Sequence, residues 1–217
     1  MWEIPKPPVM LVADLDLAGD RLLSVVGESL RAGCKWVLVR VKSSPPNILA
    51  QVTSRIMQLS KIWDALVFVS RHPEVAAENN AHGVHLPWGS NPGECRRVLG
   101  YDVVVGMSTH SLDEALHAEK LDADYITLSP IYPSISKPSY NKSLGLQQLK
   151  EVAERVRIPV IALGGITLGR AGPCLASGAR GVAVSGAVIY AQNPYEVMAD
   201  LISEVLTKRP PTFQKTA

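Results

Sequence analysis

The residues best suited to move a proton lie at the end of one apolar run. Residues 103–109 pass from three valines into Gly, Met, Ser and Thr, and the imidazole of His110 follows. An imidazole has a pKa of about 6.5, so it can take up and release a proton near neutral pH. Ser111 and Glu114 have the spacing of a capping box, in which the carboxylate returns to the Ser111 amide; this predicts that a helix starts here. His110 is therefore expected at a strand-to-helix corner, where it acts as a general acid and base or serves in packing alone.

Two glycine-containing corners indicate a phosphate site. Gly164 and Gly165 follow the apolar run 160–163, and Ser185 and Gly186 follow the run 182–184. Glycine lets backbone amides approach phosphate oxygens closely, and Ser185 adds a hydroxyl. The glycines could also serve only as tight turns. Their place after two successive late strands favours phosphate, because many barrels bind phosphate at that position.

Further polar groups could complete an anion site. Ser134, Ser136 and Lys137 lie in the longest loop, and such a group of hydroxyls and an ammonium suits an oxyanion. Arg40 and Lys42 end the second apolar run. They could be solvated charges at a strand end. If the strands form a parallel barrel, however, Arg40, Lys42 and Lys137 would form an electropositive rim for a phosphorylated or carboxylated ligand.

The elements that must position these groups alternate regularly along the chain. Near-continuous apolar runs are typical of parallel strands covered by helices on both sides, and segments of helical spacing separate them. The runs are residues 9–13, 36–40, 65–69, 83–86, 103–107, 125–128, 160–163 and 182–184, and the clearest helices are 73–78, 92–99, 112–120 and 146–156. About eight such units predict an α/β fold with a single (β/α)8 TIM barrel. An open doubly wound sheet is the alternative, but its G-x-G-x-x-G turn is missing after the first strand.

Length and composition agree with a single folded domain. The chain has 217 residues and is 47% hydrophobic, enough for a substantial core. We expect the barrel at residues 9–207, an N-terminal extension at 1–8 and a flexible tail at 208–217. The formal charge of +2, without a long basic run, argues against nucleic acid as a partner.

The cysteines and the absence of long apolar segments indicate the compartment. Cys34, Cys95 and Cys174 are odd in number and widely separated, which argues against a disulfide framework and against a zinc site. No apolar stretch approaches the roughly 18 residues of a membrane span, and the N-terminus does not resemble a signal peptide. We therefore expect a cytoplasmic protein that does not bind membranes. The sequence is compatible with a homo-oligomer.

The motifs, in the order in which they occur, resemble the thiamine phosphate synthase superfamily. The resemblance extends over nearly the whole chain, from about residue 9 to residue 200. The motifs are Val39-Arg40-Val41-Lys42, His82-Gly83-Val84-His85-Leu86-Pro87, Gly106-Met107-Ser108-Thr109-His110, residues 130–137 and residues 158–166. This resemblance implies a thiamine-pathway barrel whose small-molecule ligand is a thiazole phosphate. In the synthase branch, the ligand would be held by the 134–137 loop, the double glycine and the Ser185 corner, and a pyrophosphate by Arg40 and Lys42. Ser108 is also predicted to bind substrate.

Two departures from the synthase pattern bear on the branch. Synthases carry Asn-Asp-Arg after the third strand and Gln-x-Asp after the fourth, and those carboxylates hold magnesium. Here Ser70 and Ser90 take the carboxylate positions, and serine hydroxyls are poor replacements for anionic magnesium ligands. We therefore expect no cofactor, with magnesium required only if the chain is a synthase.

The remaining motifs are similar to the TenI-type thiazole tautomerase branch. Residues 86–90 and 108–115 match that branch, and its catalytic histidine falls on His110. The main prediction is thus a metal-independent isomerase that uses His110 as general acid and base. The loop 132–137 is closer to the synthase pattern, so a transferase joining hydroxymethylpyrimidine pyrophosphate to thiazole phosphate is the first alternative. A non-catalytic binder of thiazole or thiamine phosphate is the second.

Overall fold

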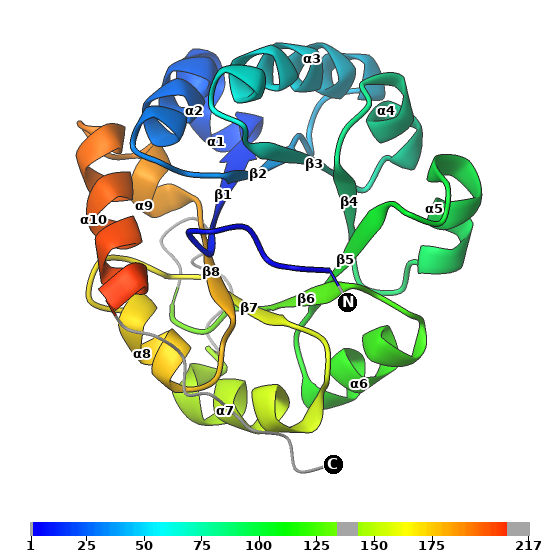
Figure 1. Ribbon diagram of the computed structural model, residues 1–217, viewed down its shortest axis with the longest axis vertical. Coiled ribbons are helices and arrows are strands. Elements are labelled where there is room, and N and C mark those ends of the chain that lie inside the picture. The colour runs from blue at the N-terminus through cyan, green and yellow to red at the C-terminus, as the bar shows by residue number, and fades with distance from the viewer. Residues whose placement is uncertain (1, 134–142, 208–217) are drawn as a thin grey trace.

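The computed structural model describes residues 2–133 and 143–207, and these form a closed parallel barrel. Each strand pairs with the next along the chain, and the first pairs with the last. Figure 1 shows the strands as an inner ring, with helices surrounding them. The predicted single (β/α)8 TIM barrel is confirmed.

The strands are short and almost entirely buried. They are β1 (Val9–Asp14), β2 (Trp36–Arg40), β3 (Leu66–Ser70), β4 (Gly83–Leu86), β5 (Val104–Thr109), β6 (Tyr125–Leu128), β7 (Val160–Leu163) and β8 (Gly181–Val184). The sequence placed β2, β4, β6 and β7 at these same bounds. The fifth strand was predicted to end at Met107, but it continues to Thr109, which brings Ser108 into the ladder opposite Thr127.

The helices cover the outside of the barrel. They are α1 (Leu15–Ala18), the 3-10 turn η1 (Gly19–Arg21), α2 (Leu22–Arg31), α3 (Pro46–Ile62), α4 (Pro73–Glu78), α5 (Pro92–Leu99), α6 (Leu112–Lys120), α7 (Gly145–Arg155), α8 (Ala171–Ala176), α9 (Gly186–Ile189) and α10 (Pro194–Thr207). Four of them begin at a proline, because the first helical position needs no amide hydrogen. Among the described residues, no helix combines the length and the apolar character needed to cross a membrane.

Alternation along the strands divides the core into two parts. Successive strand side chains point to opposite faces, so one set packs under the helices and the other fills the barrel. The interior set is a separate cluster built around Met10, Trp36, Phe68, Tyr125 and Ile161. The same alternation directs the last residue of several strands into the carboxyl-end mouth.

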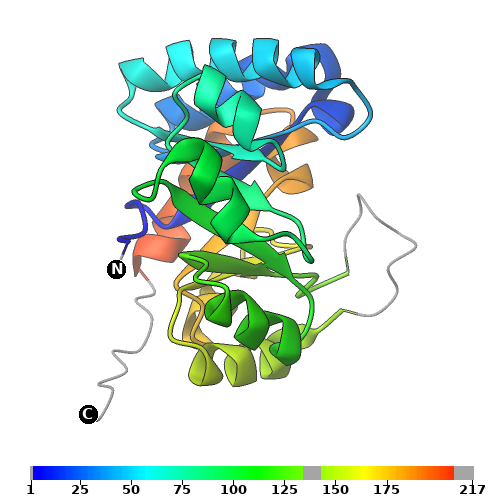
Figure 2. The ribbon, with the colours of Figure 1, turned by 90° about the vertical axis from the view of Figure 1, so that its right-hand side faces the viewer.

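The segment before β1 packs against this interior cluster. The ring of Trp2 lies 5.3 Å from the rings of Trp36 and Tyr125 and 5.8 Å from the ring of Phe68. In Figure 1 this segment crosses the opening of the barrel, and Figure 2 shows it at one end of the molecule. The amino end of the barrel is therefore filled by aromatic rings, which leaves the carboxyl end for ligands.

Candidate active site

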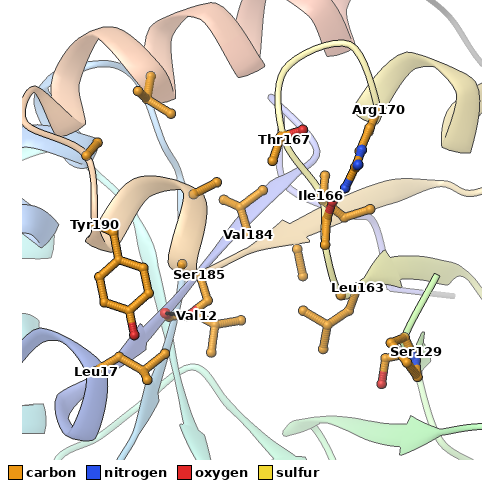
Figure 3. A pocket seen from close by; sticks show the side chains of 18 of the residues that line it. Val12, Leu17, Ser129, Leu163, Ile166, Thr167, Arg170, Val184, Ser185 and Tyr190 are labelled. Carbon is orange, nitrogen blue, oxygen red and sulfur yellow. Dashed lines mark hydrogen bonds between the residues drawn. The ribbon is translucent and has the colours of Figure 1, made fainter. Parts of the chain in front are cut away.

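One cavity of about 720 Å³ lies at the carboxyl end of the barrel. Six of the residues predicted for the site contribute to its wall: Arg40, His110, Gly164, Gly165, Ser185 and Gly186. Figure 3 shows Tyr190 and Leu17 on one side of the cavity and Thr167 and Arg170 on the other, with Ser185 between them. The carboxyl ends of β2, β7 and β8 are thus brought to one space, as the barrel requires.

The double glycine is required by close packing and by backbone conformation. Gly164 and Gly165 have φ values of +94° and +64°. A Cβ at Gly164 would lie 2.7 Å from the Cα of Pro130, and one at Gly165 would lie 2.5 Å from the carbonyl oxygen of Pro133. Both positions therefore demand glycine, and the β7 corner is pressed against the loop that follows β6.

The second corner presents Ser185 to the cavity. Its hydroxyl donates a hydrogen bond of 3.1 Å to the carbonyl of Val12 on β1, which fixes the side chain. Because that hydroxyl proton is used, an anion at this corner would have to be met by backbone amides rather than by the Ser185 hydroxyl. The two corners together place glycine-containing backbone and one fixed serine on the cavity wall.

His110 is exposed at the cavity wall and is held in a defined orientation. Its Nδ1 lies 2.7 Å from the carbonyl oxygen of Ser129, so Nδ1 carries the proton and donates it there. In the neutral ring, Nε2 then carries the lone pair that can accept a proton. Imidazole oriented by a second group is the arrangement of a general base.

The capping box holds the backbone of His110 as well. Ser111 Oγ accepts from the Glu114 amide at 3.1 Å, which confirms the predicted start of α6. The carboxylate of Glu114, however, accepts from the amide of His110 at 2.7 Å, one residue before the predicted Ser111. The strand continues through Thr109, which places the His110 amide within reach of that carboxylate.

Cations gather at the ends of β2 and β3. Arg40 donates to the buried carboxylate of Asp14 at 2.9 Å, and the exposed Lys42 continues from it. Burial lowers the pKa of Arg40, which Asp14 opposes and Arg71 reinforces. Burial also lowers the pKa of Lys42, as do the charges of Arg40 and Arg71, while Asp14 and Asp16 raise it. The charges of Arg40 and Arg71 both act on Lys42, so these three cations lie close together. Their combined positive potential would attract a ligand with several negative charges.

Two of the cations at this mouth did not stand out in the sequence. Arg71 follows β3 with a φ of +72°, a left-handed conformation that is rare for arginine and marks a constrained position. Arg170 lines the cavity, donates from Nη1 to the Gly165 carbonyl at 2.8 Å and lies 4.9 Å from the centre of the Tyr132 ring. Arg170 therefore ties the glycine corner to the loop after β6.

Ser108 lies near the carboxyl end of β5, points into the barrel and is not among the residues that line the large cavity. Its Oγ is 3.0 Å from Nε2 of His85, a fully buried ring whose Nδ1 is 3.1 Å from the hydroxyl of Tyr125. Gly106 makes this arrangement possible, since a Cβ there would come within 2.1 Å of the Tyr125 ring. Burial, together with the charge of Arg40, lowers the pKa of His85 to about 3.

Comparison with known proteins agrees with the fold and identifies the family. Residues 9–188 match the family model described as thiamine monophosphate synthase. The chain belongs to this family. It is 33% identical to thiamine-phosphate synthase from Chlorobium luteolum, over 94% of this chain and 96% of that one. It is 34% identical to the thiamine-phosphate synthase of Pyrococcus furiosus, over 83% of this chain and 88% of that one. Thiamine phosphate pyrophosphorylase from the same organism has a similar structure, with a TM-score of 0.82 and 30% identity over 92% and 95% of the two chains.

The thiamine monophosphate synthase family raises the question of magnesium, and the residues found here do not fit it. Ser70 ends β3 on the interior face and is 8% exposed, and Ser90 lies in the loop before α5. The carboxylate of Asp14 is already bonded to Arg40 and to the amide of Asp16. Within residues 2–133 and 143–207, no group of three His, Cys, Asp or Glu side chains could hold a metal. Magnesium prefers carboxylate ligands, so these hydroxyls are a poor donor set for it.

The remaining predicted site residues are not all placed. Lys42 lies beside Arg40 but is not among the residues that line the cavity. Ser134, Ser136 and Lys137 lie outside the described residues, as does the tail 208–217. The structure thus shows where the residues predicted at the strand ends lie, but their binding roles stay predictions, as does the loop predicted as a second wall.

Proposed function

We propose that this chain is a thiamine-pathway enzyme that binds a thiazole phosphate and joins it to a pyrimidine carried as its pyrophosphate. The observation that carries the proposal is the presence of two anion-attracting regions in one mouth. One is the pocket formed by Gly164, Gly165 and Ser185, and the other is the cation group of Arg40, Lys42 and Arg71. A transferase with a phosphate on its acceptor and a pyrophosphate on its donor needs two such regions. The names of the relatives support the same reaction.

The chemistry balances without a proton transfer. The bond between the pyrimidine methylene carbon and the pyrophosphate oxygen breaks, and the pyrophosphate leaves with the electron pair. The lone pair of the thiazole nitrogen forms the new carbon–nitrogen bond. Arg40, Lys42 and Arg71 would stabilise the charge that develops on the leaving group, and the β7 and β8 corners would hold the thiazole phosphate.

One observation favours a second candidate, a thiazole tautomerase. His110 lines the cavity, and the bond from its Nδ1 to Ser129 fixes the ring and leaves Nε2 as the nitrogen that would remove and return a proton on one substrate. A tautomerase needs no metal, so the serines at positions 70 and 90 would not impair it. For a metal-bound pyrophosphate the same serines are a disadvantage, because they lack the carboxylates that hold magnesium.

The two reactions are separated by one set of assays on the full chain. With both substrates and added Mg²⁺, release of pyrophosphate together with thiamine phosphate is expected from the transferase. Interchange of carboxythiazole phosphate tautomers, without the pyrimidine substrate, is expected from the second candidate. His110→Gln should slow the tautomer interchange by about 10²- to 10⁴-fold, because it removes the acid and base. The transferase step moves no proton and should lose less. Absence of both products, with thiazole phosphate still bound, would refute both reactions and leave a non-catalytic binder.

A further inference from the structure

A chain of buried polar side chains runs through the interior of the barrel toward the mouth. The hydroxyl of Tyr125 lies 3.1 Å from Nδ1 of His85. On the other side of that ring, Nε2 lies 3.0 Å from Ser108 Oγ and 3.2 Å from Thr127 Oγ1. Tyr125 and Thr127 are 0% exposed and His85 is 4% exposed, whereas Ser108 is half-buried and so reaches the solvent side.

The surroundings of Tyr125 determine which group donates at the first link. Its ring is packed against the rings of Trp2, Trp36 and Phe68, which offer its hydroxyl no acceptor oxygen. Among the hydrogen bonds of the described residues, His85 is the partner of that hydroxyl. A buried O–H without an acceptor is costly, whereas an oxygen lone pair left unused costs less. Tyr125 therefore donates, and Nδ1 of His85 accepts.

The second link follows from the first. His85 is neutral near pH 7, since burial and the charge of Arg40 hold its pKa at about 3. A neutral imidazole has one N–H, and with Nδ1 accepting, this proton is on Nε2. The Nε2 proton points to the oxygens of Ser108 and Thr127, so Ser108 Oγ accepts at this bond. The hydroxyl proton of Ser108 is then not used toward His85.

We propose that Tyr125 and His85 are positioning residues that turn the Ser108 hydroxyl into a hydrogen-bond donor for a ligand that reaches down from the cavity to the carboxyl end of β5. The ligand atom met by Ser108 must then be an acceptor, such as a ring nitrogen or a carboxylate oxygen, and not an N–H or O–H group. The identity of that ligand rests on the proposed function, but the direction of the hydrogen bonds does not. Tyr125 and His85 therefore act on the ligand only through Ser108.

The first test needs neither ligand nor variant. Long-range proton–nitrogen correlation NMR of the full chain distinguishes the two neutral tautomers of each histidine, and His85 is assigned through its contacts with the stacked Tyr125 ring. We expect a protonated Nε2 and an unprotonated Nδ1 for His85. His110, whose Nδ1 donates to Ser129, should show the opposite tautomer when neutral and serves as an internal contrast. A protonated Nδ1 on His85 would overturn the proposal.

The second test asks whether the direction matters for binding. Ser108→Ala should weaken calorimetric binding of thiazole phosphate by roughly 3- to 10-fold, the size expected for one lost hydrogen bond. Tyr125→Phe removes the donor at Nδ1, so the His85 spectrum should become a mixture of tautomers and binding should weaken comparably. Thr127→Val is the matched control, because it removes the other oxygen at Nε2 and should leave both the tautomer and the affinity unchanged.

These tests can fail independently of the proposed function. An unchanged tautomer and unchanged affinity in Tyr125→Phe would overturn the positioning role. If that variant does not fold, the wild-type spectrum decides the matter. If wild-type protein binds no thiazole phosphate, the proposed function fails, and the tautomer of His85 still supports or overturns the hydrogen-bond direction.

Discussion

Arg170 offers the sharpest test of the phosphate site, because its side chain contacts the corner that would hold the anion. Its guanidinium donates to the Gly165 carbonyl at 2.8 Å, lies 4.9 Å from the centre of the Tyr132 ring and lines the cavity. A hydrogen bond from a charged donor contributes about 1.5–3 kcal/mol when buried, but Arg170 is exposed, so about 1 kcal/mol is reasonable. The cation–π contact at an exposed site adds about 0.5–1 kcal/mol.

Arg170→Gln removes a positive charge from the cavity wall and the bond that holds the Gly165 carbonyl. Binding of thiazole phosphate should therefore weaken by about tenfold, the factor that corresponds to about 1.4 kcal/mol, which is of the size expected for one partly exposed charge interaction. The comparison that isolates the phosphate uses the dephosphorylated thiazole alcohol, whose binding should change by about twofold or less. Calorimetry on the full chain measures both. Arg180→Gln is the matched control, because it removes the same charge from an exposed arginine just before β8, at the opposite end of the barrel. Equal losses for the phosphate and the alcohol would refute the assignment of Arg170 to phosphate binding.

Three further perturbations test the interior and the mouth. First, the folded protein holds the pKa of His85 at about 3, below its value of about 6.5 in the unfolded chain, so the free energy of unfolding should rise with pH across this range. Stability should be lost as pH falls from about 6.5 to about 3, by several kcal/mol in all. Urea unfolding at several pH values measures this, and an equal dependence of the unfolding free energy on pH in His85→Asn would contradict it. Second, Gly106→Ala should destabilise the fold by about 3 kcal/mol or more, because its Cβ would meet the Tyr125 ring at 2.1 Å. Gly27→Ala in α2 is the control: nothing lies within 4 Å of its Cβ, so it should be neutral or stabilising by up to about 1 kcal/mol. Thermal unfolding compares the two variants. Third, Ser70→Asp combined with Ser90→Asp should create measurable Mg²⁺ binding in calorimetry, because it supplies the missing carboxylates; wild-type-like heats would show that these positions do not converge on a metal.

Much of the fold could be predicted because buried parallel strands leave a strong pattern. Eight apolar runs, each followed by a polar or glycine-containing corner, required only counting and the rule that parallel strands are covered by helices. The corners at Gly164 and Ser185 were predictable for the same reason, since their positions after the last strands are a property of the chain order. The end of the fifth strand was missed because Ser108 and Thr109 are polar, and pairing with β6 outweighs that local signal.

The partners of individual side chains could not be predicted in this way. In the sequence, Arg170 and Arg71 look like ordinary solvated charges. Only the hydrogen bond of Arg170 to the Gly165 carbonyl and the left-handed conformation of Arg71 show that both positions are constrained. Ser108 and His110 belong to one sequence motif, and both were predicted for the site. In the structure, Ser108 points into the barrel toward His85, and His110 lies beyond the strand at the cavity wall.

This separation bears on the choice between the two reactions. The row of buried polar side chains ends at Ser108, and His110 stands apart from it at the corner before α6, with its ring bonded to Ser129. Neither group depends on the other for its orientation, so the barrel can hold a ligand acceptor atom through Ser108 whether or not His110 moves a proton. A transferase would use the mouth for two anions and leave His110 without a proton to move, whereas a tautomerase would need His110 and only one substrate. The activity of His110→Gln, measured against that of Ser108→Ala, therefore separates chemistry from binding in the same cavity.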